Sequence, residues 1–335
     1  MYPVAPGGAH SILSAQSDAD HSRYRRLISH GFSEKAMREQ EPVATSYIDL
    51  LIQRLRERAK HGPQDMVAWY NWTTFDLIGD LTFGESFDCL EKAVYHPWIE
   101  FVFSNIKAIM IISILRRFPV VPQILMGLFR KQMEKRAQNA KYTKEKVARR
   151  MAMDTDRTDF LSYILRHKGK ETEMTIPEIQ STSSILVLGG SETTATLLSG
   201  VTYLLLKNPE VLKRLNSEIR GYFSKEEDIN MVSVNSQTYL LAVLEEGMRV
   251  FPPVPLGSPR ISAPEGDTIA GHNIPGGALV IANNYASTHS SRNWKDPFSF
   301  VPGRWLNDPR YADDNKSASA PFSLGPRNCI GRNIR

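Results

Sequence analysis

Apolar side chains recur at helical spacing in the first part of the chain. Ile48, Leu51, Ile52, Leu55 and Ala59 follow the i, i+3, i+4, i+7, i+11 spacing of one helix face, and Gly62-Pro63 ends the pattern. We therefore predict helix across residues 18–60. The stretch 69–87 is dense in aromatic residues, which predicts a helix packed deep in the core and followed by a turn.

A long helix is predicted across residues 175–207. Thr175 and Glu178 have the spacing of a capping box, and no stop signal follows until Pro209. Gly189-Gly190 interrupts the centre of this helix, and each glycine costs about 1 kcal/mol relative to alanine. Either close helix packing or backbone space for a ligand should compensate for them, and both explanations are open.

The last third of the chain has shorter elements. Residues 240–250 predict a helix that carries Glu246 and Arg249 three positions apart on one face. Beyond it, Thr268–Ala270 and Ala278–Ala282 predict a small hairpin bounded by glycine turns. We therefore expect a mainly α fold with a small β portion.

Two adjacent segments bear on contact with membranes. Residues 109–129 are the most apolar region, but arginines and prolines interrupt them, and no window has the unbroken apolar length of a spanning helix. They are either core or a peripheral patch that dips into one leaflet. The basic run 130–150 predicts a solvated helix face, with contact to anionic lipid as the alternative.

Composition narrows the classes of function. A net charge of +5 on 335 residues is mild and gives no reason to expect a nucleic-acid partner. Cys89 and Cys329 are the only cysteines, which argues against a disulfide scaffold and for a reducing compartment. Cys89 follows the aromatic helix and is expected to be a small buried side chain.

The chemistry concentrates around Cys329. The stretch Phe322-Ser323-Leu324-Gly325-Pro326-Arg327-Asn328-Cys329-Ile330-Gly331 places this cysteine among glycines and an arginine. Glycines let backbone amides approach closely, and amides and a guanidinium both favour thiolate over thiol. The stretch therefore reads as a thiolate ligand in a sheltered bend, and the alternative is a surface loop with a stray cysteine.

The pattern Phe-x-x-Gly-x-Arg-x-Cys-x-Gly resembles the haem-binding loop of the cytochrome P-450 family of haem-thiolate monooxygenases. The resemblance implies haem b with Cys329 as the axial ligand of the iron, and a single partial domain over residues 1–335. It also implies that Arg327 and Arg260 bind haem propionates, which suits the bidentate fit of guanidinium to carboxylate. The alternative for Arg260 is a surface charge on a strand edge.

Three upstream motifs agree with this resemblance in their order along the chain. His21 and Arg25 are similar to the family's aromatic-x-x-x-Arg pair on the helix that faces the propionates, with His in place of the usual Trp; a solvated basic face is the alternative. Gly-Gly-x-Glu-Thr-Thr is similar to the oxygen-binding groove, so Thr193 would hydrogen-bond the bound oxygen and Glu192 would lie in the proton path.

The third motif is structural. Glu246 and Arg249 match the family's Glu-x-x-Arg, and Arg304 lies in the matching stretch Phe300-Val301-Pro302-Gly303-Arg304-Trp305. The resemblance implies that these three side chains form a buried ionic network behind the haem, where breaking one partner is costly.

The reaction implied is insertion of one oxygen atom from O2 into a small apolar substrate, in fungal secondary metabolism. Electrons would come from NADPH through a flavoprotein NADPH-cytochrome reductase, which would dock near Arg327, Arg332 and Arg335. Localisation by resemblance is the cytosolic side of the endoplasmic reticulum membrane. Compared with the family, the N-terminal anchor and first elements and the C-terminal helix and strands are missing, so the alternative is a truncated, inactive remnant.

Overall fold

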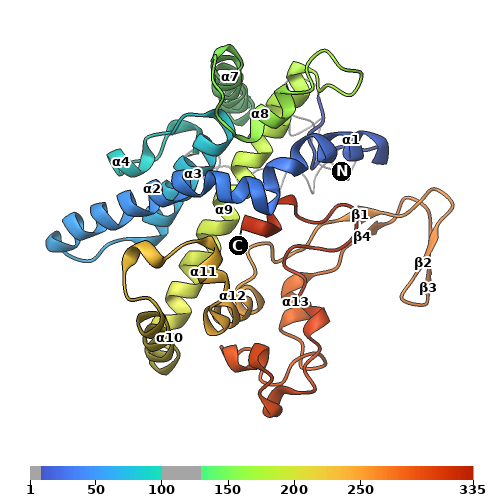
Figure 1. Ribbon diagram of the computed structural model, residues 1–335. Helices are drawn as coiled ribbons and strands as arrows, with labels where there is room; N and C mark the ends of the chain where they lie inside the picture. The colour runs from blue at the N-terminus through green and yellow to red at the C-terminus, as the bar shows by residue number, and fades with distance from the viewer. Residues whose placement is uncertain (1–8, 100–129, 335) are drawn as a thin grey trace. The chain divides into compact units, whose positions relative to one another are not determined.

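The computed structural model describes residues 9–99 and 130–334, without the side chains of 130–139 and Ile334 (Figure 1). The contacts divide the chain into two compact units, Met1–Glu192 with Asn333–Arg335 and Thr193–Arg332. Each unit is described by itself below. The expectation of a single domain over residues 1–335 stays a prediction.

The first unit is helical in the described residues. Its helices are α1 Asp18–Ser29, α2 Glu34–Arg58, α3 Met66–Phe83, α4 Cys89–Lys92, α7 Arg130–Ala152, α8 Phe160–Leu165 and the first half of α9 Ile176–Lys207. The predicted helix over 18–60 is confirmed, with an interruption by the 3-10 turn His30–Phe32 and by Ser33. The Ser33 side chain accepts the N–H of Ala36 and caps the start of α2. The long helix is confirmed with its cap, because Thr175 N–H donates to Glu178 Oε2 at 2.8 Å.

The predicted apolar face of α2 is partly wrong. Ile48 and Ile52 are 52% and 37% exposed, whereas Leu51 is buried against Trp69 and Leu90. The buried stripe lies about one residue to the side of the predicted one, because Tyr47, Leu50 and Leu55 complete it. The large aromatic rings of α3 determine which face of α2 is covered.

The core helix α3 was predicted correctly. It begins at Asp65, whose carboxylate caps the helix, and ends at Gly84, which has a φ of 73°. Asp76 lies buried in its middle and accepts the backbone N–H groups of Phe87, Cys89 and Leu90, which fixes the turn into α4. Burial raises the pKa of Asp76, and these hydrogen bonds oppose the effect. Cys89 is buried, as predicted.

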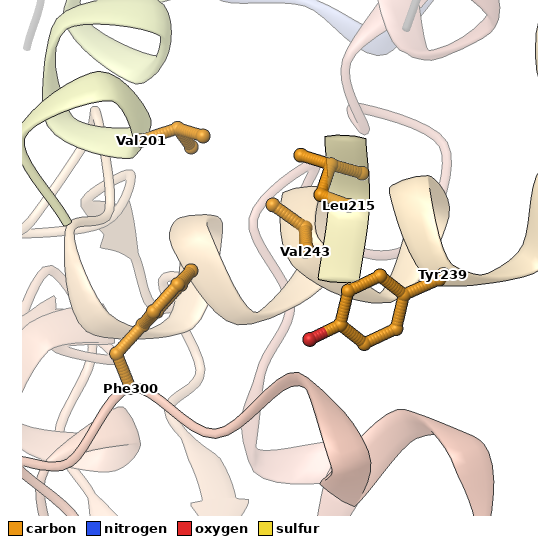
Figure 2. Packing of buried hydrophobic residues seen from close by; sticks show 5 residues of the cluster. All are labelled: Val201, Leu215, Tyr239, Val243 and Phe300. Carbon is orange, nitrogen blue, oxygen red and sulfur yellow. The ribbon is translucent and has the colours of Figure 1, made fainter. Parts of the chain in front are cut away.

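The second unit contains the remaining helices and the small sheets. These are the rest of α9, α10 Pro209–Tyr222, α11 Met231–Asn235, α12 Thr238–Val250, β1 Arg260–Ile261, β2 Asp267–Ile269, β3 His272–Ile274, β4 Leu279–Val280 and α13 Asn284–Thr288. Figure 2 shows its apolar core, in which Val201 of α9, Leu215 of α10, Tyr239 and Val243 of α12, and Phe300 form one buried cluster. The mainly α fold class with a minor β portion is confirmed.

The strand pairing differs from the prediction. Strand β2 pairs with β3, and β4 pairs with β1, so Thr268–Ala270 does not pair with Ala278–Ala282. Ala270 and Gly271 both have positive φ, at 51° and 80°, which makes a two-residue turn and returns the chain at once. The glycines at 276–277 then lead into β4 instead of turning the predicted hairpin.

The predictions about membrane contact have different outcomes. Among the described helices, none is both long and apolar enough to cross a bilayer. The predicted peripheral patch over 109–129 lies outside the described residues. The solvated face predicted for 130–150 is partly wrong: Lys146 and Arg150 are buried and pair with Glu85 and Asp159 at 2.9 and 2.6 Å. A buried cation needs such a partner.

Candidate active site

The loop that carries Cys329 is a tight bend in the second unit. Cys329 N–H donates to the carbonyl of Phe322 at 2.8 Å, and Asn328 N–H donates to the carbonyl of Gly325 at 3.0 Å. Ser323 and Gly325 both have left-handed backbones, with φ of 58° and 78°, which suits glycine and strains serine. The bend presents Cys329 on the surface of its unit, outside any disulfide.

Two predicted propionate ligands lie in the same unit as the cysteine. Arg327 is half-buried inside the loop itself, two residues before Cys329. Arg260 is exposed on β1 and donates from Nη1 to the carbonyl of Pro259 at 3.1 Å. Its position on a short edge strand fits both the surface-charge and the propionate interpretation.

The other two predicted ligands lie on α1 in the first unit. His21 is only 5% exposed, and Arg25, one turn further along the helix, is half-buried. A solvated basic face is therefore wrong for His21, since this side chain lies inside the unit.

The two glycines in the centre of α9 have different surroundings. A Cβ on Gly190 would lie 2.6 Å from Cδ1 of Ile78, so this glycine permits close packing against α3. A Cβ on Gly189 would meet no atom of the described residues within 4 Å. Close packing thus explains Gly190, while Gly189 is exposed and the ligand explanation stays a prediction for it.

Glu192 and Thr193 follow the glycines on the same helix and are both half-buried. Oε2 of Glu192 is buried and has no hydrogen-bond partner among the described residues. Burial raises the pKa of Glu192, so this carboxyl holds its proton at higher pH than an exposed glutamate does. A carboxyl of this kind is suited to donating and recovering a proton.

Glu246 is the centre of an ionic network in the second unit. Its carboxylate is fully buried and accepts five hydrogen bonds, from Arg249 Nε and Nη2, Arg304 Nε, Trp305 Nε1 and the Val301 N–H. The structure thus brings together the three side chains expected to form a network, with N–O distances of 2.8 to 3.2 Å.

Both arginines of the network are satisfied beyond Glu246. Arg249 also donates to the carbonyls of Thr288, Pro297 and Ser299, at 2.6 to 2.9 Å. Arg304 donates to Asp314 Oδ2 at 2.6 Å and to the Asp296 carbonyl at 2.8 Å, and its guanidinium lies 4.1 Å from the ring centroid of Tyr311. The network ties α12 to the loop segment 288–314.

Asp314 is the member that the sequence motifs missed. It is buried, and its other oxygen accepts the N–H of Lys295 at 2.7 Å. Arg304 and Asp314 lie ten residues apart, and no motif includes the aspartate. The available signal was charge balance: two buried arginines and one glutamate carry a net positive charge, and a buried network of that kind requires a second carboxylate.

The donors of the second unit fit a haem group. A haem b of the thiolate-ligated type takes one cysteine as ligand of its iron, and cations suit its two propionates. The second unit supplies an exposed cysteine in a bend with open space at Gly325, together with Arg327 and Arg260. Leu324, in the same loop, is exposed and adds apolar surface on which a porphyrin could pack.

A surface cavity of about 550 Å³ also opens in the first unit, between α1, α2 and α8. His30, Lys35 and Arg166 are among the residues that line it, and no predicted site residue does. The size of a cavity is therefore a poor guide to the site in this protein. The side chains that fit a haem group, Cys329, Arg327 and Arg260, are the better guide.

Comparison with known proteins identifies the family to which the chain belongs. The family profile of cytochrome P-450 matches residues 4–334, which is nearly the whole chain. This protein belongs to the cytochrome P-450 family.

Individual relatives are fungal. Averantin hydroxylase of Dothistroma septosporum is 46% identical over 99% of this chain and 63% of its own length. Cytochrome P-450 monooxygenase aclL of Aspergillus oryzae is 44% identical over 100% and 68%, and trichothecene C-15 hydroxylase of Fusarium sporotrichioides is 41% identical over 96% and 68%. The chain thus spans about two thirds of the length of these relatives.

Proposed function

We propose that this protein is a haem-dependent monooxygenase that inserts one oxygen atom from O2 into a small apolar molecule of fungal secondary metabolism. The observation that carries the proposal is the bend that presents Cys329, in a chain of the cytochrome P-450 family. Two of the relatives are named as hydroxylases, which supports hydroxylation as the reaction class.

In this proposal Cys329 is the axial ligand, and Arg260, Arg327, His21 and Arg25 bind the propionates. When bound, haem b supplies oxygen activation, and a thiolate ligand contributes the electron density that favours O–O cleavage. In this proposal the nearby Arg327 favours the thiolate form of the sulfur, because a cation stabilises negative charge.

In this proposal Glu192 donates a proton and Thr193 orients it. The raised pKa of Glu192 keeps its carboxyl protonated at higher pH, so it is able to give up a proton on demand. The Thr193 hydroxyl, next along α9, would orient that proton towards the open side of the helix at Gly189. Glu246, Arg249 and Arg304 have a structural role in this proposal, since all three are buried and both arginines pair with Glu246.

The electron donor in this proposal is NADPH, through a flavoprotein reductase that docks near Arg327 and Arg332. Arg332 is exposed, as docking requires; Arg335 lies outside the described residues. Family resemblance favours the cytosolic surface of the endoplasmic reticulum membrane as the location.

The ligand assignment is tested with Cys329→Ser. The reduced carbon monoxide adduct of the haem-loaded protein should show the red-shifted Soret band of a thiolate-ligated haem, and Cys329→Ser should abolish it. Cys89→Ala is the matched control, because it removes the other cysteine, which is buried away from solvent. The proposal is wrong if Cys329→Ser keeps the band, or if Cys89→Ala loses it while still binding haem.

A further inference from the structure

The surface cavity between α1, α2 and α8 contains none of the residues assigned to haem. Its volume of about 550 Å³ lies within the range of small-molecule sites, about 300–1,000 Å³, and its wall belongs entirely to the first unit. Among the described residues that line it, the charged ones and the histidines are Lys35, Arg166, His30, His167 and a single acid, Glu39. A cavity with this balance of charge is suited to a small anionic molecule.

Arg166, the residue that follows helix α8, is placed to bind an anion. Its guanidinium lies 4.6 Å from the ring centroid of Tyr163, and no described carboxylate pairs with it. Arg150 and Arg157 of the same unit, by contrast, each pair with an aspartate. The ring orients the planar guanidinium of Arg166, whose N–H groups can then bind phosphate oxygens through two parallel hydrogen bonds.

The ring on which this guanidinium lies is held by close packing. A Cβ on Gly31 would lie 3.1 Å from Cδ2 of Tyr163 and 3.2 Å from Cδ1 of Phe160, so both rings lie against the backbone at this glycine. Phe160 in turn stacks on Phe32, with ring centroids 4.3 Å apart. Because this packing fixes the ring, binding of an anion requires little further ordering of Arg166.

A second cation comes from the first turn of α2. Nζ of Lys35 lies 3.9 Å from Oε1 of Glu39, and the two side chains are 88% and 44% exposed. An exposed pair at this distance contributes little to stability, so the ammonium group can exchange the carboxylate for a ligand. Lys35 and Arg166 together match the charge of a phosphate monoester, which is about −1.5 to −2 near neutral pH.

We propose that this cavity binds a small molecule that carries a phosphate monoester, with the phosphate held by Arg166 and Lys35. Further donors for the phosphate oxygens lie in the same wall: the hydroxyls of Tyr163 and Thr158 and the imidazole of His30. A carboxylate has one charge and two oxygens, so this set of donors fits it less well.

The ligand is larger than the phosphate group itself. A phosphate group occupies a few times the volume of a water molecule, which is about 30 Å³, so most of the cavity remains for the organic part. Either a soluble phosphate ester or the headgroup of phosphatidic acid supplies the same chemistry.

The test is a calorimetric titration of the purified full chain with glycerol 3-phosphate in a phosphate-free buffer. Binding should be saturable, and Arg166→Gln should weaken it at least about tenfold, because the charged hydrogen bonds to the phosphate are lost. Arg166→Lys keeps the charge but not the two parallel N–H groups, so its affinity should lie between those of the wild type and Arg166→Gln.

A variant with the opposite effect does not depend on loss of binding. Glu39→Gln removes the single negative charge of the wall and should tighten binding about two- to fivefold. Because Glu39 and Arg166 are both exposed, we expect their variants to fold.

The matched control is Arg58→Gln. Arg58 is exposed at the other end of α2, outside the cavity, so the same loss of charge should change binding by less than about twofold. Equal weakening in Arg58→Gln and Arg166→Gln overturns the proposal. Succinate, which carries two carboxylates, tests the class of ligand: if it binds as tightly as glycerol 3-phosphate, the site does not select phosphate.

Vesicles distinguish the two sources of the phosphate. Flotation with phosphatidylcholine vesicles, with and without phosphatidic acid, shows whether a lipid headgroup binds and whether Arg166→Gln abolishes that binding. Binding of glycerol 3-phosphate alone indicates a soluble ligand, and binding of phosphatidic acid vesicles alone indicates a lipid. If neither probe binds, with glycerol 3-phosphate tested up to about 10 mM, the proposal is wrong. The titration requires no turnover, so its result is independent of the carbon monoxide test of Cys329.

Discussion

Removal of the second carboxylate of the ionic network should be costly, although no sequence motif marks it. Asp314→Asn keeps the size of the side chain and removes its charge. Asp314 accepts one bond from Arg304 Nη1 at 2.6 Å and another from the Lys295 N–H at 2.7 Å. Asparagine has one acceptor oxygen, so one of these donors would face the amide NH2.

The size of the effect follows from burial. Arg304 and Asp314 have side chains that are 0% and 2% exposed, so water cannot replace the lost partner. A hydrogen bond to a charged group contributes about 1.5–3 kcal/mol, and breaking a buried ion pair costs about 3–5 kcal/mol. Because Arg304 keeps Glu246 and one carbonyl, we expect a loss of about 3 kcal/mol, where the two ranges meet.

Urea unfolding followed by tryptophan fluorescence measures this loss. Trp305 donates to Glu246, so its share of the emission from the five tryptophans responds to loss of the network. A loss of about 3 kcal/mol should lower the urea midpoint by about 1 M, given a slope of about 3 kcal/mol per molar urea.

The control is Glu218→Gln, which breaks an exposed pair with Arg214 one helical turn away and should cost about 0.3–0.5 kcal/mol. The double variant Arg304→Met with Asp314→Leu should recover part of the loss, because no unpaired charge then remains beside Tyr311. If Asp314→Asn costs no more than Glu218→Gln, then the aspartate does not balance the network and the reasoning fails.

Two further predictions concern the first unit. Gly190→Ala should destabilise the protein by about 1–3 kcal/mol, because the new Cβ meets Ile78. Gly189→Ala should stabilise α9 by up to about 1 kcal/mol and impair substrate oxidation. Equal effects of the two substitutions on the thermal unfolding midpoint would contradict the difference in surroundings. Burial opposes ionisation of Glu178, but its hydrogen bonds, of which the one from Arg23 is the strongest, lower its pKa to about 2. The ionised carboxylate therefore stabilises the fold above the ordinary pKa of 4.5, and this contribution is lost as the pH falls towards 2. Glu178→Gln should flatten the pH dependence of the unfolding midpoint in that window, and an unchanged slope would be evidence against the pairing.

Local signals in the sequence predicted most of the helices. The capping pair Thr175 and Glu178 specifies the start of α9 through bonds that the two residues make with each other, so no distant partner is needed. The glycine that ends α3 acts in the same way, through its own positive φ. Helix ends of this kind can be predicted from sequence because the interactions that stabilise them are made by residues close together in the chain.

Contacts between distant residues were predicted less well. The register of the strands depends on the tight turn at Ala270-Gly271, where a non-glycine residue adopts a left-handed backbone that propensity disfavours. The face of α2 that is buried depends on Trp69 and Leu90, which come later in the chain. Both errors arise because tertiary packing selects among local alternatives of similar energy.

The predictions about charge were incomplete for one shared reason. The basic run of α7 looked solvated, yet Arg150 is buried against Asp159, and the predicted trio around Glu246 lacked the Asp314 that neutralises it. Sequence shows the sign of each charge but not its partner, and burial is tolerated only when the partner is there. The role of a buried charged residue in this chain is therefore understood once the oppositely charged partners that neutralise it have been found. By that criterion Glu192 stands out: its Oε2 is buried and has no hydrogen-bond partner among the described residues, which is consistent with the proton-carrying role proposed for it.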